Sequence, residues 1–181
     1  MEVMGGFIVG FDHDDEGIFD RQIRWIQEHG VVQAMVGLLT ALPGTQLWHR
    51  LDTEGRLLGD SSGTNTGAQA LNFLTVMPPD VLKAGLRRIQ AYIYEPKNYY
   101  KRIKKFLRDY KPTVRGKISI AEVVALIKSV FKIGIISRSR WQYWKLMFGT
   151  AFTKTKKFPA AINLAIFGEH FRRHAKEISV M

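Results

Sequence analysis

Two apolar runs near the start of the chain, separated by an amphipathic segment, predict a strand, a helix and a second strand. Residues 3–11 and 31–42 are apolar with little polar alternation, which is typical of strands in a parallel sheet. Between them we expect a helix capped by Asp14 and ended by Gly30, with apolar residues at helical spacing: Phe19, Ile23 and Ile26. This order predicts that the two strands pair in parallel.

A short helix is expected after the second strand. Pro43-Gly44 predicts a turn, and Thr45 is a suitable N-cap. The helix would bury Leu47, Trp48 and Leu51 and close at Gly55. Residues 71–77 are the one further strand candidate, and Pro78-Pro79 ends it.

The second half of the chain shows helical periodicity throughout. We expect helices over 80–94, 97–110, 119–135, 138–152 and 158–178. The predicted fold is therefore α/β at the N-terminus, followed by an all-α C-terminal region. The expected segments are an α/β part (1–58), a loop with a helical extension (59–110), a linker (111–117) and a basic helical region (118–181).

A two-stranded parallel sheet is too small to stand by itself. Both of its edges would be unpaired, and both predicted strands are too apolar to face water. We therefore expect the strands to belong to a larger sheet, whose other strands precede residue 1 or come from another chain.

The amino-acid composition excludes several kinds of catalytic and structural site. The 181 residues include no Cys, which excludes a disulfide framework, a Cys nucleophile and a cysteine-ligated iron–sulfur cluster within this chain. Residues 1–90 carry 7 Lys and Arg against 11 Asp and Glu, whereas residues 91–181 carry 20 against 5. The basic half suits an anionic membrane surface, nucleic acid or an acidic partner, and a lysine-rich solvated surface explains it equally well.

Nothing in the sequence predicts export or a membrane span. Residues 1–10 lack the basic start and long apolar region of a signal peptide. The longest apolar region, 118–136, is interrupted by Glu122, Lys128 and Lys132. We expect a cytoplasmic protein, with peripheral contact to the inner face of the membrane as a further candidate location.

The candidate site lies where the two strands end. In a parallel sheet both following loops, 10–14 and 40–45, fall at the same edge. Asp12 and His13 are candidates to accept a ribose hydrogen bond or to transfer a proton, although both would also be tolerated in solvent. Together with Pro43, Gly44 and Thr45 they form the predicted substrate cleft. Asp12 and Thr45 are therefore expected in one cleft.

At these loops the sequence resembles a known enzyme family. Gly6-Phe7-Ile8-Val9-Gly10 resembles the Gly-x-Ile-x-Gly motif in the fifth strand of radical S-adenosylmethionine enzymes, although His13 stands where the family often has Glu. Residues 41–45 resemble the Leu-Pro-Gly-Thr turn of the branch that carries an N-terminal cobalamin-binding domain. Glu54-Gly55-Arg56-Leu57, Asn72-Phe73 and residues 94–100 are similar to a subgroup with an appended helical domain of unknown function. The resemblance covers about residues 2–110.

The resemblance implies the end of a TIM-like radical S-adenosylmethionine barrel and an adenosine site on this chain. Its binding residues would be Gly6, Ile8, Gly10, Leu39, Thr40 and Ala41, with glycine allowing close backbone approach and Ile8 facing adenine. The alternative is that Gly6 and Gly10 only relieve packing in a tight barrel strand.

In the whole family protein, S-adenosylmethionine, a [4Fe–4S] cluster and, as a candidate, cobalamin would be the cofactors. This chain lacks the signature Cys-x3-Cys-x2-Cys. It is expected to bind none of them alone, to hold no catalytic residue and to be inactive without its partner, the missing N-terminal half of the barrel.

Two features of the second half have competing interpretations. His170 and His174 are spaced like metal ligands, but the neighbouring Arg172, Arg173 and Lys176 oppose a cation, so we expect no metal. The mixture of basic and aromatic residues in 138–158 suits a membrane interface, and it also suits a helical core. The alternative function is thus a non-enzymatic basic module that binds an anionic membrane or nucleic acid. Nucleic acid is the less expected partner because the tyrosines suit helix packing better than base stacking.

Overall fold

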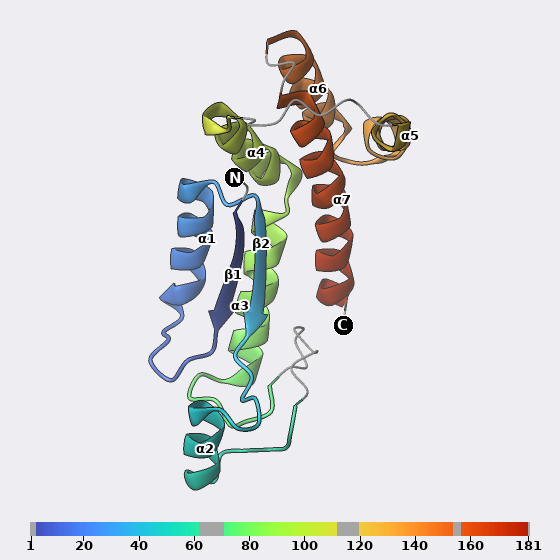
Figure 1. Cartoon of the computed structure of the whole chain (residues 1–181). Helices are drawn as coiled ribbons and strands as arrows, with labels where there is room; N and C mark the ends of the chain where they lie inside the picture. The colour runs from blue at the N-terminus through green and yellow to red at the C-terminus, as the bar shows by residue number, and fades with distance from the viewer. Residues whose placement is uncertain (1–2, 62–70, 112–119, 154–156, 181) are drawn as a thin grey trace.

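The computed structural model describes residues 3–61, 71–111, 120–153 and 157–180. Most of the predicted linker, 111–117, lies outside these residues. The elements are two strands and a series of helices: β1 (Met4–Val9), α1 (Gly17–His29), β2 (Gln33–Leu38), α2 (Gln46–Thr53), α3 (Pro79–Ile93), α4 (Pro96–Asp109), α5 (Ile120–Ser129), the π-helix η1 (Val130–Ile136), α6 (Arg140–Thr153) and α7 (Phe158–Val180). The fold is mixed α/β and mostly helical (Figure 1).

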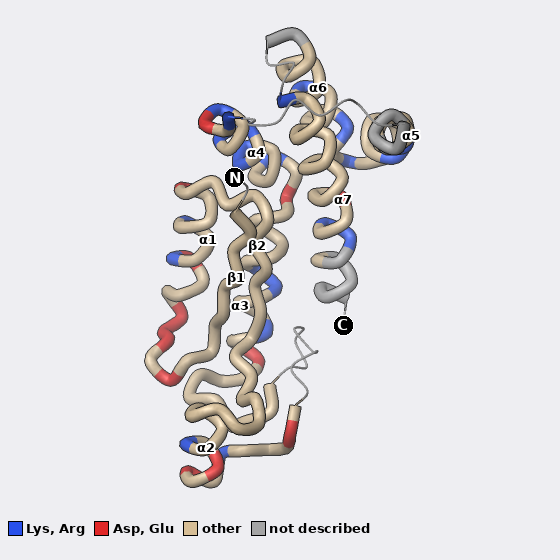
Figure 2. The backbone as a smooth tube through the Cα atoms, viewed as in Figure 1, with Lys and Arg blue, Asp and Glu red and all other residues tan. Residues whose placement is uncertain are grey.

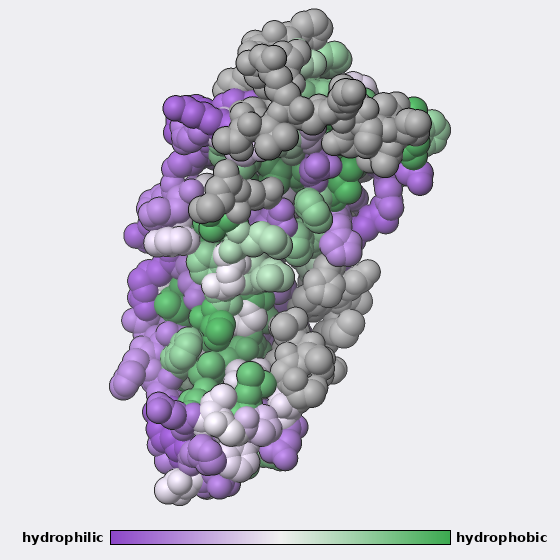
Figure 3. Space-filling view, viewed as in Figure 1, coloured by the Kyte–Doolittle hydropathy of each residue, from purple (hydrophilic) through white to green (hydrophobic). Residues whose placement is uncertain are grey.

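The two strands pair in parallel, as predicted, in a register that joins Met4 to Gln33 and Val9 to Leu38. Helices α1 and α3 cover one face of this sheet, because Phe7 and Val9 on β1 and Val36 on β2 point toward them and pack in the same core. On the opposite face Met4, Ile8 and Met35 are about half exposed, whereas Gln33, which pairs with Met4, is buried. Figure 3 looks onto that face and shows a hydrophobic surface at its centre.

Both strands are shorter than predicted. β1 stops at Val9 because Gly10 has a φ of 109°, which turns the chain out of the sheet. β2 stops at Leu38, and Ala41 is instead held by the side chain of Asn72. The predicted strand over 71–77 is wrong, since that segment forms an isolated antiparallel bridge between Phe73 and Leu57.

The prediction that Asp14 caps α1 is also wrong. Helix α1 begins at Gly17, and its N-cap residue, Glu16, makes no capping side-chain bond. The Asp14 carboxylate accepts instead from the N–H groups of Gly10 (2.8 Å) and Phe11 (3.0 Å). A carboxylate in this position satisfies the backbone of the loop before the helix rather than that of the helix itself.

The helix ends predicted at Gly30, Thr45 and Gly55 are confirmed. Gly30 ends α1 in the left-handed conformation, and its N–H donates to the carbonyl oxygen of Ile26. Thr45 caps α2 by accepting from the Trp48 N–H at 3.2 Å, and Gly55 follows that helix with a φ of 67°. Leu51 is fully buried against Leu47 and Trp48.

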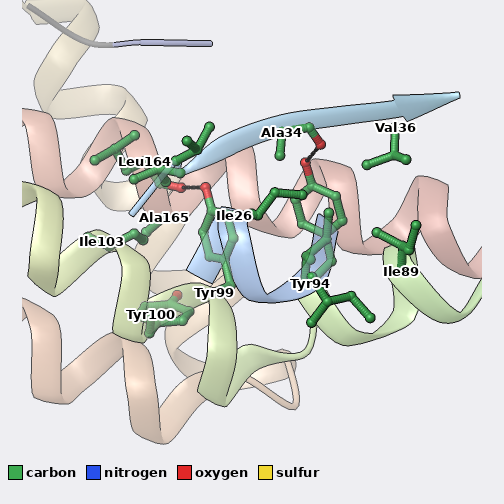
Figure 4. Packing of buried hydrophobic residues seen from close by; sticks show 14 of the residues in the cluster. Ile26, Ala34, Val36, Ile89, Tyr94, Tyr99, Tyr100, Ile103, Leu164 and Ala165 are labelled. Carbon is green, nitrogen blue, oxygen red and sulfur yellow. Dashed lines mark hydrogen bonds between the residues drawn. The ribbon is translucent and has the colours of Figure 1, made fainter. Parts of the chain in front are cut away.

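Close helix contacts depend on two glycines. An added Cβ at Gly85 in α3 would overlap the ring of Phe19 in α1, and one at Gly168 in α7 would overlap the ring of Tyr99 in α4. The Tyr99 hydroxyl also donates to the carbonyl oxygen of Leu164 in α7 at 2.8 Å (Figure 4). One hydrophobic core therefore runs from the sheet through α3 and α4 to α7.

The predicted helix over 119–135 consists of two parts. After α5, residues Val130–Ile136 form a π-helix, a wider turn that is rare and usually has a local cause. Here the indole N–H of Trp144 in α6 donates to the Gly134 carbonyl oxygen at 3.0 Å, and the ring lies close above Gly134. In the part of the chain that is described, no helix has the length and apolarity that crossing a membrane requires.

Candidate functional site

The candidate site lies at the carboxyl ends of β1 and β2. Because the strands are parallel, the loop 10–16 and the loop 39–45 leave the sheet at the same end, where α2 also lies (Figure 1). The antiparallel pairing that would have separated Asp12 from Thr45 does not occur.

Asp12 forms the strongest polar contact of this end. Its carboxylate receives two bonds from Arg56, from Nη2 at 2.8 Å and Nη1 at 3.2 Å, and a third from Arg50 Nη2 at 2.8 Å. Arg56 also donates from Nε to the Leu74 carbonyl oxygen and pairs with Glu54. The loop after β1 is thereby tied to α2 and to the segment that follows it.

Asp12 and Arg56 each stabilise the charged form of the other. The Arg56 guanidinium, hydrogen-bonded to Asp12, holds the pKa of that carboxyl below its ordinary value. In return, the Asp12 carboxylate raises the pKa of Arg56. Asp12 is therefore ionised at neutral pH, with both oxygens engaged, which favours a positioning role for it over proton transfer.

The role of the two arginines was missed by sequence reasoning. Arg56 belongs to a run that resembles the family, yet nothing in that run indicated a partner 44 residues away. Arg50 lies on α2, where alternating charges are common on a solvent face.

The remaining predicted cleft residues are exposed in the loops at the same end of the sheet. They are His13, Pro43, Gly44 and Thr45. Pro43 and Gly44 form the turn that the sequence predicted: Gly44 has a φ of 80° and the Thr45 N–H donates to the Leu42 carbonyl oxygen at 3.2 Å.

The backbone of the second loop is largely engaged within the chain. Asn72 binds Ala41 at both backbone groups, accepting from its N–H at 2.9 Å and donating to its C=O at 2.8 Å. The Leu39 N–H donates to the Val9 carbonyl oxygen, and the Thr40 hydroxyl lies 3.5 Å from the Leu38 carbonyl oxygen. Adenine could contact the Leu39 N–H or the backbone of Ala41 only by sharing groups that already form these hydrogen bonds. Adenine binding at this loop therefore stays a prediction.

The glycines of the first strand differ in what requires them. Gly10 needs its left-handed backbone, and Gly5 has no room for a side chain because Phe7 and Val31 crowd it. At Gly6 the backbone is ordinary, and no atom of the described residues outside Gly6 and its two chain neighbours lies within 4 Å of the position that a Cβ would occupy. Gly6 shares the open face with Ile8, which is 49% exposed.

Comparison with known proteins identifies the family. The model of the family described as "Domain of unknown function (DUF4070)" matches residues 45–180. The chain belongs to the DUF4070 family. The match continues to residue 180, so the resemblance seen in the sequence, which ended near residue 110, stopped too early.

Two relatives are methyltransferases by name. The chain is 29% identical over 175 residues to an uncharacterized methyltransferase of Synechocystis sp. (strain ATCC 27184 / PCC 6803 / Kazusa), covering 94% of this chain and 33% of that protein. It is 27% identical over 159 residues to the hopanoid C-2 methylase of Rhodopseudomonas palustris (strain TIE-1), covering 80% and 28%. The chain thus spans about a third of their length. No solved structure matches it.

Proposed function

We propose that this chain is the C-terminal part of a radical S-adenosylmethionine methyltransferase and that it contributes one wall of the S-adenosylmethionine and substrate cleft. The observation that carries the proposal is Gly6, a strand glycine for which nothing in the described chain provides a reason. Its φ is not left-handed, and the space above it is open. A ligand or a further strand outside this chain would use that space.

The face around Gly6 supports the same conclusion. Met4, Ile8 and Met35 lie on it, and each has about half of its surface exposed (58%, 49% and 55%). An apolar strand face of this kind is normally covered, because parallel sheets bury both faces. In a barrel this face would point inward, toward the cleft where adenine binds against apolar side chains.

The two edges of the sheet are unequal, which supports a position at the end of a larger sheet. On the outer edge of β2, Gln90 donates to the Val36 carbonyl oxygen at 3.2 Å. The Tyr94 hydroxyl donates to the Ala34 carbonyl oxygen at 2.6 Å (Figure 4). Two side chains, one from α3 and one from its C-cap residue, therefore bond to the β2 edge, whereas on the β1 edge of the described chain one side chain, Gln22, donates from Nε2 to the Ile8 carbonyl oxygen at 2.9 Å. We infer that the preceding strands add to the β1 edge.

The residues present fit part of the cofactor set. Gly6 and Ile8 suit the adenosyl group, and Asp12 with Arg56 fixes the loop beside it. A [4Fe–4S] cluster does not fit this chain, because the chain contains no Cys. Thiolates from outside residues 1–181 would have to hold the cluster, so we assign no step through it to these residues.

The proposed substrate class is supported by the name of one relative. One relative is named for methylation of a hopanoid. We propose that the substrate of the whole enzyme is likewise hydrophobic, and that the open apolar face of β1 and β2 lines its path.

The test compares the chain alone with the chain produced together with the segment that supplies Cys-x3-Cys-x2-Cys. Alone, it should take up no stoichiometric iron after anaerobic reconstitution and show no micromolar S-adenosylmethionine binding by calorimetry. Each of the few hydrogen bonds that this chain offers contributes about 1 kcal/mol, and their sum is less than the several kcal/mol that immobilising a ligand costs. The combined protein should take up iron and bind S-adenosylmethionine. A lone chain that binds either would contradict the proposal.

A further inference from the structure

The C-terminal helices present an apolar row that nothing in the described part of the chain covers. Ile127, Phe131 and Ile135 follow one another at intervals of four along α5 and η1, and they are 62%, 65% and 53% exposed. Ile136, the last residue of η1, and Trp141, near the start of α6, are also exposed, at 71% and 69%. So many large apolar side chains in one exposed segment are typical of an interaction surface.

The orientation of this row is fixed by contacts on the other side of the same segment. Ile133 is buried in the core, and Gly134 lies against Trp144. The Ser129 hydroxyl is hydrogen-bonded to the buried Tyr143 hydroxyl at 2.8 Å. Because these contacts anchor one face of α5 and η1, the opposite face is held outward.

The sequence around the row is strongly basic, and Glu122 near the start of α5 is the exception. Residues 123–168 contain no Asp or Glu, and they contain eight basic residues: Lys128, Lys132, Arg138, Arg140, Lys145, Lys154, Lys156 and Lys157. Lys128 and Lys132 are exposed and alternate with the apolar row. Figure 2 shows this basic character on α5 and η1, and Figure 3 shows hydrophobic and hydrophilic residues side by side there.

We propose that α5 and η1 dock on the surface of an anionic lipid bilayer. Ile127, Phe131 and Ile135 would enter the boundary between headgroups and acyl chains, while Lys128 and Lys132 would meet the lipid phosphates. Exposed basic residues alone would suit nucleic acid, but large apolar side chains between them gain nothing from a phosphate backbone. The contact is interfacial, since the described helices are not of the kind that spans a bilayer. This docking is independent of the proposed methyl transfer.

The test is co-sedimentation of the whole chain with vesicles of phosphatidylcholine alone and of equal parts phosphatidylcholine and phosphatidylglycerol. We expect binding to the anionic vesicles that weakens at high salt. K128Q/K132Q should lower the partition coefficient roughly 30-fold, since each lysine near an anionic surface contributes about a factor of five. F131S/I135S should lower it at least about tenfold through lost apolar burial.

Two matched controls distinguish docking through this row from a general effect of net charge or of surface hydrophobicity. K101Q/K104Q removes the same charge from exposed positions on α4, and L58S/V76S removes side chains of similar exposure (65% and 66%) outside the row. Both should bind vesicles like the unchanged chain. Equal loss in control and test variants, equal binding to both vesicle types, or tighter binding to a DNA or RNA oligonucleotide would overturn the proposal.

Discussion

Replacing Gly168 by Ala is expected to destabilise the chain by about 3 kcal/mol, because the new methyl group overlaps the Tyr99 ring. To make room, Tyr99 has to move, and its hydroxyl then loses the bond to the Leu164 carbonyl oxygen. Thermal unfolding followed by circular dichroism should show a midpoint lower by roughly 10 °C.

Gly149→Ala is the matched control, because it makes the same change in a helix at a position where, among the described residues, no atom outside the helix's own neighbouring backbone lies within 4 Å of the new Cβ. The better helix propensity of Ala should raise stability there by up to about 1 kcal/mol. If both substitutions stabilise the chain, α4 and α7 do not pack as described here.

The second large effect is expected at Arg102, which is 1% exposed and pairs with no carboxylate of the described residues. Its Nη1 donates to Gln27 Oε1 at 2.5 Å, while Nε and Nη2 have no hydrogen-bond partner in the described part of the chain. The rings of Tyr94 and Tyr99 lie 6.0 and 5.3 Å from the guanidinium carbon. Burial lowers the pKa of Arg102 to about 10.

Gln27→Leu should therefore cost about 3 kcal/mol, because it leaves a buried cation without its acceptor. Arg102→Met removes that cation, and the chain should be as stable as the unchanged one to within about 1 kcal/mol. In the double variant Gln27→Leu should cost little, and urea unfolding of all four proteins measures this coupling. Additive losses would show that Gln27 matters for another reason.

The parallel pair of strands was predictable, because the two apolar runs and the helix between them are local signals. The strand ends were not. β2 ends where Asn72, 31 residues away, holds Ala41, and no local pattern encodes that contact. The prediction that Asp14 caps α1 was wrong because a carboxylate before a helix can accept hydrogen bonds either from the helix or from the preceding loop.

In the candidate site, too, one part was predictable from the sequence and another was not. The direction of the strands predicted that the site residues lie in loops at one end of the sheet. The bond from Arg56 to Asp12 was not predictable, because it depends on how α2 folds back over the strand ends. The π-helix was not predictable from the sequence either, since Trp144 and Gly134 come into contact only when α6 packs on η1. Local sequence thus predicts elements, and contacts between distant segments determine where they end and what their side chains bind.

If the space at Gly6 belongs to S-adenosylmethionine, as proposed, Gly6→Val should weaken S-adenosylmethionine binding without weakening the fold. In the chain alone this substitution should leave stability unchanged or slightly higher, because the space is open and valine suits a strand. In the protein that also contains the Cys-x3-Cys-x2-Cys segment, the measured quantity is the S-adenosylmethionine dissociation constant, alongside the unfolding midpoint. We predict binding weaker by roughly tenfold or more at an unchanged midpoint. Unchanged affinity, or a midpoint that falls together with it, would contradict the claim and assign Gly6 to strand packing.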